Sequence, residues 1–398
     1  MISPEFPPVG GGATTRVTKL VRYLAREGVQ LEVLTAPPGP QHPLDSQRLK
    51  EVEGLVRIHQ AEPPQALMQG LAWLYRDTFR GALRLYHLIE PGFPDRLCWW
   101  CLGAWKQARQ AARRAQVVWT TGPPYGAHLL GYVLRSLHRL PWVMDCRDPW
   151  TQNFIYRHRG LRRRIEEAFE GHLLRRADRV VAVTETLVEQ LSRRFGAEVV
   201  HLSNGFDPED LPPIAPTDAK VRRLIYAGVL NEYRDPEPLA RAILGLGRSD
   251  LCLELFGPVW RELGPALREL QRRGQLQVQG ALPHREALAS LAAADVAVVL
   301  GEADPRADVA VGGKVYELLA LGVPILGLVV PGEMCRLLEA GGARVAHPQD
   351  EQAIACCLAE MLVRPREVRP QAGCDHPQAY PRLARQLLDI LQQVARPR

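Results

Sequence analysis

Short apolar runs alternate with longer amphipathic stretches along most of this chain, and this alternation limits the possible folds more than any other feature. The run at 117–120, for example, is followed by a stretch at 126–138 whose apolar residues recur with the spacing of a helix. Repeated units of a strand and a helix build parallel sheets that helices cover. The sequence therefore predicts an α/β protein.

The alternation occurs in two sets, and 398 residues exceed the size at which a single core normally stops growing, so we expect two domains. In the first set, strands are expected at 31–35, 117–120, 142–145, 180–183 and 199–202, and helices at 15–27, 95–115, 126–138, 162–176 and 185–195. In the second set, strands are expected at 224–227, 251–256, 276–279, 296–300, 324–327 and 343–346.

A segment rich in proline and acidic residues, 207–216, separates the two sets. Such a segment fits neither a helix interior nor a central strand, because proline lacks the backbone N–H that both need. We therefore expect an N-terminal domain at 1–205, a linker at 206–220, a C-terminal domain at 221–375 and a final helical segment at 376–398.

The composition indicates a folded protein with a modest positive charge. Hydrophobic residues make up 46% and charged residues 24%, which is typical of globular and not of disordered chains. The net charge of +6 reflects local arginine clusters at 157–164 and 175–179. A basic face can attract phosphates, anionic lipid or nucleic acid, whereas a solvated helix face explains the same clusters equally well.

The eight cysteines are scattered and the start lacks the pattern of a signal peptide, so we expect no disulfide framework and a cytoplasmic location. Cys98 and Cys101 have the spacing of a redox or metal pair, but no second pair completes a zinc site. Core packing on a tryptophan-rich helix is the preferred interpretation.

One segment, 66–89, has apolar residues at helical spacing between Arg76, Arg80 and Arg84. No apolar run reaches the roughly 20 residues that span a bilayer. The pattern is compatible with a helix that lies on a membrane surface, which would place the protein at the inner face of the membrane. Ordinary core packing explains it as well.

Glycines precede two expected helices. Gly11 and Gly12 stand between a strand and a helix, where the backbone can approach a phosphate and unpaired helical N–H groups can bind it. A flexible turn is the alternative. A dinucleotide fingerprint is incomplete, because Thr15 stands where the third glycine is required, so a dehydrogenase is disfavoured.

Gly312 and Gly313 repeat this arrangement before a helix that carries Lys314 and Glu317. The spacing i, i+3 places both side chains on one helical face. Lys314 can offset the charge of a departing diphosphate, and Glu317 can accept hydrogen bonds from ribose hydroxyls. The alternative is an ordinary surface pair of lysine and glutamate.

Several segments, in this order and spacing, resemble motifs of the bacterial family 4 glycosyltransferases, and the resemblance covers nearly the whole chain. They are the opening Ile-Ser-Pro-Glu-Phe-Pro-Pro-Val-Gly-Gly-Gly at 2–12, Thr-Gly-Pro-Pro-Tyr-Gly-Ala-His at 121–128, Asp-Cys-Arg-Asp-Pro-Trp at 145–150, Ser-Asn-Gly-Phe-Asp at 203–207, Gly-Ala-Leu-Pro at 280–283 and Gly-Lys-Val-Tyr-Glu-Leu-Leu-Ala-Leu-Gly-Val-Pro-Ile at 313–325.

The resemblance implies a GT-B fold, in which two Rossmann-like domains face each other across a central cleft and the last helix returns to the first domain. It implies a hexosyltransferase-like enzyme that moves a sugar, with retention of configuration, from a nucleoside-diphosphate sugar to a hydroxyl acceptor. The acceptor would be a glycan or a lipid-linked precursor of cell-surface polysaccharide. Only residues 1–3 remain for the first strand, so that strand is short or the sequence begins within it.

On the donor side, the resemblance assigns nucleotide binding to Leu282, Gly312, Gly313 and Glu317, in addition to Gly11 and Gly12 of the first glycine loop. The chain departs from the family at the position eight residues before Glu317, where the usual acid is Val309. The acids nearby, which are candidates to replace it, are Glu302, Asp304 and Asp308.

The basic residue expected after Gly228 is replaced by Val229, and Arg234 is the nearest substitute. Arg234 would then share the diphosphate with Lys314. A salt bridge within the loop is the alternative for Arg234.

On the acceptor side, Asp148 and His128 are the candidate catalytic residues. Asp145 ends an expected strand and Arg147 and Asp148 follow, at the edge where open α/β sheets bind ligands. One of the acids could orient the acceptor hydroxyl, and an internal ion pair is the alternative. His128 could hydrogen-bond the donor or the acceptor, or serve the structure alone.

Sugar transfer passes through an oxocarbenium-like state, so the site must stabilise a leaving diphosphate and exclude water. The sequence shows no pair of carboxylates at hydrolase spacing and no Asp-x-Asp pair, so we expect no metal and no other cofactor. Three alternatives remain open: a GT-B nucleotide-sugar epimerase, a non-catalytic sugar-nucleotide-binding protein, and a nucleic-acid-binding protein. The last lacks interleaved aromatic and basic residues and is disfavoured.

Overall fold

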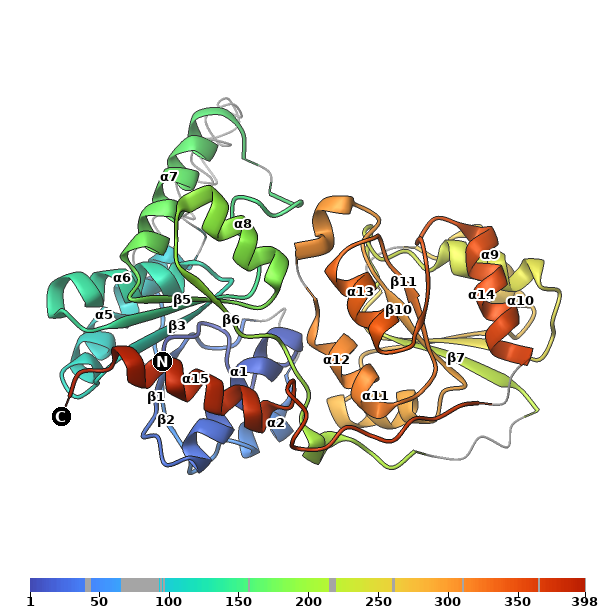
Figure 1. Cartoon of the computed structure of the whole chain (residues 1–398), viewed down its shortest axis with the longest axis horizontal. Helices are drawn as coiled ribbons and strands as arrows, with labels where there is room; N and C mark the ends of the chain where they lie inside the picture. Colours follow the sequence, from blue (N-terminus) through green and yellow to red (C-terminus); the bar gives the residue numbers. More distant parts are fainter. Residues whose placement is uncertain are drawn as a thin grey trace. The chain divides into compact units, whose positions relative to one another are not determined.

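The computed structural model describes residues 1–39, 44–65, 93, 95, 97–156, 158–214, 220–259, 262–309, 311–363 and 366–397. The chain divides into two compact units (Figure 1). The first comprises Met1–Ser203 and Pro381–Arg398, and the second comprises Asn204–Tyr380. Each unit contains a parallel sheet with helices beside it, so the predicted α/β fold is confirmed.

The first unit contains a four-stranded parallel sheet in the order β3-β4-β5-β6 and a parallel pair, β1-β2. The N-terminal residues join the two, because Ile2 pairs with Leu34 of β1 on one side and with Thr120 of β3 on the other. Residues 1–3 therefore act as the short first strand. The strands are β1 Glu32–Thr35, β2 Arg57–Gln60, β3 Val118–Gly122, β4 Trp142–Cys146, β5 Arg179–Ala182 and β6 Val199–His201.

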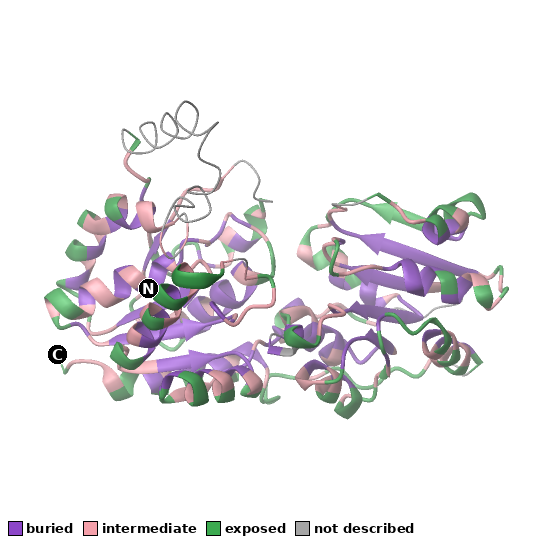
Figure 2. Ribbon diagram, turned by 90° about the horizontal axis from the view of Figure 1, so that it is seen from above, coloured by how far each residue is buried: buried purple, intermediate pink, exposed green. Residues whose placement is uncertain are grey.

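Amphipathic helices cover this sheet, and Figure 2 shows that the strands are buried while the outward helical faces are exposed. The strands β3 and β4 are buried along their whole length, as expected of central parallel strands. The helices are α1 Gly12–Arg26, α2 Ser46–Lys50, α5 Cys98–Ala112, α6 Gly126–His138, α7 Gly160–Arg176, α8 Glu185–Phe195 and α15 Tyr380–Val394.

The second unit contains one six-stranded parallel sheet in the order β12-β11-β10-β7-β8-β9. Its strands are β7 Arg222–Ala227, β8 Leu251–Phe256, β9 Leu276–Gln279, β10 Val296–Leu300, β11 Ile325–Leu328 and β12 Arg344–Ala346. Its helices are η1 Pro208–Asp210, α9 Glu237–Gly245, α10 Pro265–Arg272, α11 His284–Ala292, η2 Pro305–Val309, α12 Gly313–Leu321, α13 Glu333–Ala340 and α14 Glu351–Val363.

The segment expected to be a linker begins as a packed part of the second unit. Phe206 is 1% exposed, and it pairs with Ala379 through a backbone bridge. Asp207 starts the short helix η1, because its carboxylate accepts a hydrogen bond from the Glu209 amide. The start of this segment, which is rich in proline and acidic residues, therefore forms a capped turn and not an unstructured linker.

The last helix belongs to the first unit, although it follows the second in sequence. Figure 1 shows α15 beside α1 and β6. The Arg385 guanidinium lies 2.8 Å from the Glu27 carboxylate, and the Gln386 amide donates to the His201 carbonyl. The apolar face of α15 is buried through Leu383, Leu387 and Leu391 among others.

In the first unit, two short elements, α2 and β2, were not predicted. The strand β2 is Arg-Ile-His-Gln, with exposed or half-buried side chains throughout, so no apolar run marks it. The segment 66–89, for which core packing and a membrane-surface helix were both considered, lies outside the described residues. The helix α5 begins at Cys98, and the Cys101 thiol donates to the Gly126 carbonyl at 3.1 Å, which supports core packing for this pair. All eight cysteines are free.

Candidate active site

The second unit exposes backbone at the start of α12, where a phosphate could bind. Gly312 precedes the helix in an extended conformation, and a Cβ atom added to Gly312 or Gly313 would contact nothing within 4 Å. The helix N-terminus therefore opens onto free space. Unpaired N–H groups and the helix dipole both favour an anion at such a position.

Lys314 lies directly behind this opening. Its ammonium donates a hydrogen bond to the carbonyl of Ala227, the last residue of β7. Burial and the nearby charge of Arg234 lower the pKa of Lys314 to about 8, although Glu317 opposes the shift. Arg234 and Glu317 are thus close enough to Lys314 to act on it electrostatically.

Arg234 forms an ion pair with Glu302, whose Oε1 lies 2.8 Å from the arginine Nη2 and 3.0 Å from its Nε. The loop salt bridge considered from the sequence is therefore present. Asp304 is also paired, with Arg306 at 2.5 Å, while the buried Val309 occupies the place of the missing acid. The side chain of Asp308 lies outside the described part of the chain.

Glu317 is buried and hydrogen-bonds His284, with 2.7 Å between His284 Nε2 and Glu317 Oε1. Sequence reasoning missed His284, although this histidine directly follows the predicted turn at 280–283. Leu282 of that turn is half-buried and packs against the apolar core of the second unit. The turn and the α12 glutamate therefore share one site.

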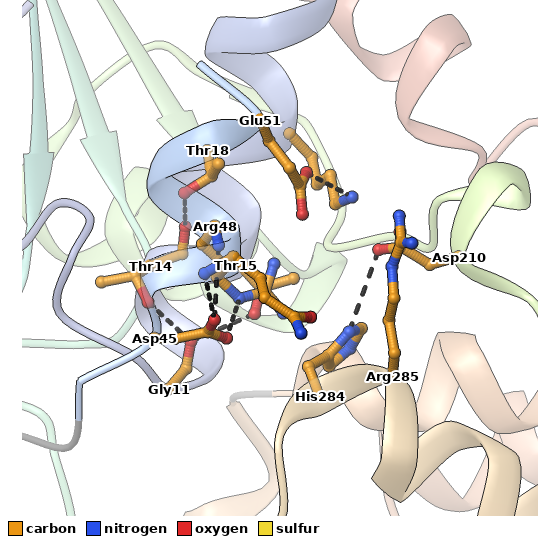
Figure 3. A network of polar contacts seen from close by, with 12 residues as sticks. Gly11, Thr14, Thr15, Thr18, Asp45, Arg48, Glu51, Asp210, His284 and Arg285 are labelled. Atoms are coloured by element: carbon orange, nitrogen blue, oxygen red, sulfur yellow. Dashed lines mark hydrogen bonds and ion pairs between the residues drawn. The ribbon is translucent and has the colours of Figure 1, made fainter. Parts of the chain in front are cut away.

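In the first unit, the glycine loop ends in the start of α1. Gly11 has φ of 115°, a conformation that suits glycine, and its carbonyl accepts hydrogen bonds from the hydroxyls of Thr14 and Thr15 (Figure 3). Added Cβ atoms at Gly11 or Gly12 would meet nothing within 4 Å. This second helix start is likewise open to an anion.

His128 is completely buried at the start of α6. The Trp142 indole N–H donates to the Thr120 hydroxyl, and His128 Nδ1 lies 2.8 Å from the same hydroxyl. The other ring nitrogen, Nε2, has no hydrogen-bond partner among the described residues. Burial, together with the charge of Arg147, lowers the pKa of His128 to about 3, so the ring is neutral.

Asp145 takes part in the internal ion pair that was the alternative interpretation. One carboxylate oxygen lies 3.3 Å from Arg16 Nη2, and the other accepts a hydrogen bond from Thr121 at 2.9 Å. Its side chain is 1% exposed. Asp145 is therefore occupied within the core, which leaves Asp148 as the acid of this edge that is only half-buried.

Two glutamates of α7 hold the loop that carries Asp148, and the sequence analysis did not identify them. Glu166 accepts hydrogen bonds from Trp150 Nε1 at 3.3 Å and from the Tyr156 hydroxyl at 2.6 Å. Glu170 accepts from the backbone amide and the hydroxyl of Thr151. Their i, i+4 spacing was a signal for one shared helical face.

Within the described ranges, no group of three or more histidine, cysteine, aspartate or glutamate side chains could hold a metal ion. In the same part of the chain, no helix is long and apolar enough to cross a membrane.

The two Rossmann-like units have the topology of the GT-B fold, and solved structures share this fold over nearly the whole chain. Sucrose-phosphate synthase from Thermosynechococcus elongatus has a TM-score of 0.62 and 17% identity, over 99% of this chain and 95% of that one. A glycosyltransferase from Rickettsia africae ESF-5 has a TM-score of 0.65 and 12% identity, over 99% and 97%. HepE from Anabaena, in complex with UDP and glucose, has a TM-score of 0.61 and 12% identity, over 98% of each chain.

The chain carries a glycosyltransferase family 4-like domain in its N-terminal part. Residues 11–205 match the family model described as a glycosyl transferase 4-like domain, which confirms the family inferred from the motifs. A search of curated protein sequences finds no significant match.

Proposed function

We propose that this glycosyltransferase moves a sugar from a nucleoside-diphosphate sugar to a hydroxyl acceptor with retention of anomeric configuration. One observation carries the donor assignment: Lys314 and Glu317 occupy the first turns of α12 behind an open glycine pair, and the charge of Arg234 acts on Lys314. The Anabaena HepE structures contain UDP or UDP-glucose, which supports a uridine donor here.

In this proposal, different residues of the second unit bind different parts of the donor. The N–H groups after Gly312 and Gly313 bind the diphosphate, and Lys314 stabilises the charge that grows as the glycosidic bond breaks. Glu317 accepts hydrogen bonds from the ribose, and the turn at Leu282 contacts the base. Arg234 adds positive charge when the phosphates compete with Glu302 for it.

The first unit supplies the acceptor side. Asp148, in a loop braced by Glu166 and Glu170, orients the acceptor hydroxyl. In this proposal His128 hydrogen-bonds a sugar hydroxyl through Nε2, because this nitrogen has no partner among the described residues. We propose a glycan or a lipid-linked precursor as the acceptor.

The test begins with a thermal-shift panel of UDP-, GDP-, ADP- and dTDP-sugars, since a ligand that binds only the folded state raises its melting temperature. The stabilising donor is then incubated with membrane and glycan extracts, and the anomeric configuration of the product is read by NMR. Donor turnover without an acceptor would indicate the epimerase instead. Donor binding without transfer to any extract would indicate the non-catalytic protein.

We further propose peripheral association with anionic membrane through the exposed face of α7. Leu161 and Ile165 are 66% and 51% exposed on adjacent turns, and the exposed Arg159 and Arg164 flank them. Apolar side chains among arginines suit the surface of an anionic bilayer. Replacement of Leu161 and Ile165 by Ser should reduce flotation with anionic liposomes, while Leu137→Ser, at 67% exposure on α6, should not. Equal recovery with neutral liposomes would contradict the proposal.

A further inference from the structure

The His284 imidazole lies between two buried carboxylates of the second unit. Its Nε2 is 2.7 Å from Glu317 Oε1 in α12, and its Nδ1 is 3.9 Å from Asp210 Oδ2 in η1. The side chains of Glu317 and Asp210 are 8% and 3% exposed, and that of His284 is 21% exposed. Figure 3 shows His284 and Arg285 both turned toward Asp210.

The two contacts differ in kind. A distance of 2.7 Å is a strong hydrogen bond, and a carboxylate can only accept, so Nε2 carries the proton and donates to Glu317. The separation of 3.9 Å from Asp210 is too long for a hydrogen bond, and this contact is an ion pair only when the imidazole is protonated. Arg285 lies 3.5 Å from the other oxygen of Asp210, which offsets part of its charge.

The backbone around His284 makes this hydrogen bond a firm restraint. Pro283 precedes the histidine and its ring fixes φ, and His284 is the first residue of α11. A glutamate side chain has several rotamers, and holding one of them costs conformational entropy. A donor that is fixed in advance lowers this cost at the moment when the ligand binds.

We propose that His284 is a positioning residue, which holds the Glu317 carboxylate in the orientation that binds ribose hydroxyls and so makes the enzyme prefer ribonucleotides to deoxyribonucleotides. This inference rests on the proposed role of Glu317. It assigns His284 no contact with the reacting atoms.

The experiment measures the dissociation constants of UDP and 2′-deoxy-UDP, and of the ADP, GDP and CDP pairs, with the full chain by calorimetry. The base whose ribonucleotide binds most tightly is chosen. For that base, the dissociation constant of the deoxyribonucleotide divided by that of the ribonucleotide is the preference that is compared between variants. The parent should prefer the ribonucleotide, and Glu317→Ala should lose this preference. His284→Ala should reduce the preference by about threefold to tenfold, which is the effect of one net hydrogen bond. His284→Gln keeps a donor and should retain most of it.

Two controls make the result specific. His347→Ala removes an exposed histidine of the same unit, whose ring accepts a hydrogen bond from the Gln349 amide, and should leave the ratio unchanged. If His284→Ala fails to fold, the preference for the ribonucleotide is measured with His284→Leu instead, which also removes the hydrogen-bond donor.

The outcomes separate this inference from the proposed function. If His284→Ala or His284→Leu keeps the parental preference for the ribonucleotide while Glu317→Ala loses it, only the role of His284 is overturned. A parental ratio in Glu317→Ala, or no binding of any nucleotide, would overturn the donor assignment and this inference together.

Discussion

Arg234 and Glu302 form an ion pair with 2.8 Å between Nη2 and Oε1, so the arginine assigned to the donor phosphates already has an anionic partner. Phosphate binding must therefore compete with Glu302. Glu302→Gln should tighten UDP binding, by roughly twofold to fivefold, because it removes the competing charge, and Arg234→Ala should weaken binding. Calorimetry checks both. Asp304→Asn is the matched control, since its partner is Arg306, and an equal effect there would point to net charge alone.

Lys314 and Glu317 should affect different kinetic constants. Lys314→Ala should lower kcat by on the order of a hundredfold, because the lysine faces charge that grows as the bond breaks. Glu317→Gln should mainly raise the donor KM, because ribose hydroxyls are bound equally in the ground state and the transition state. Steady-state kinetics at saturating and limiting donor separate the two. Melting temperatures must match the parent, and parental kinetics in both variants would contradict the donor site.

The donor KM should rise as pH increases through about 8. The pKa of Lys314 is lowered to about 8, chiefly by burial, so the ammonium is charged below that pH and neutral above it. Only the charged form attracts the diphosphate. Lys314→Arg keeps its charge and should abolish this pH dependence, whatever its effect on rate. The measurement is the donor KM between pH 6.5 and 9.5, and a flat parental profile would oppose it.

Glu170 should make the first unit less stable at neutral pH than at acidic pH. Burial raises the pKa of Glu170 to about 7 in the folded state, against 4.5 for the ordinary side chain. The folded state therefore binds the proton more tightly, and the resulting stability is fully present below pH 4.5 and lost as pH rises to about 7. Glu170→Gln imitates the protonated form.

Relative to the parent, Glu170→Gln should gain about 1 to 3 kcal/mol of unfolding free energy between pH 5 and pH 8. Urea unfolding at several pH values measures this difference. Glu167→Gln on the same helix is the comparison, because Arg163 and Arg194 pair with Glu167 and its pKa is lowered. A pH-independent difference for Glu170→Gln would show that burial does not hold its proton.

Transfer should continue in the presence of EDTA. The proposal assigns stabilisation of the diphosphate to Lys314, Arg234 and the start of α12, which are organic cations and backbone N–H groups. Initial rates are compared before and after exhaustive chelation. Loss of activity that Mn²⁺ or Mg²⁺ restores would replace this prediction with a metal-dependent mechanism.

Patterns along the chain predicted most of both sheets, because central parallel strands are buried on both faces and read as continuous apolar runs. The strand β10, Val-Ala-Val-Val-Leu, is a clear case. The strand β2 was not predicted, because its side chains are mostly polar and are exposed or half-buried. Residues 1–3 are too short to be recognised alone, and only their pairing with β1 and β3 makes them a strand.

The site was predicted only where its residues are close in sequence. Lys314 and Glu317 share one helix, so their spacing implied a common face. The partner of Glu317 lies 33 residues away, and Arg16 lies 129 residues from Asp145, so no local period could reveal either contact. The fold alone brings these groups together, and it converted Asp145 from a candidate acceptor residue into a core ion pair.

The placement of α15 has a consequence for biosynthesis. The ribosome makes residues 381–398 after the entire second unit, yet these residues complete the first. During synthesis, the surface of the first unit around Glu27 and His201 therefore stays uncovered until α15 is made. The second unit can fold from one contiguous stretch of chain. The usual N-to-C order of domain folding is thereby reversed for the final step. A premature stop codon after Tyr380 would leave the later-made unit whole and the earlier-made one unfinished.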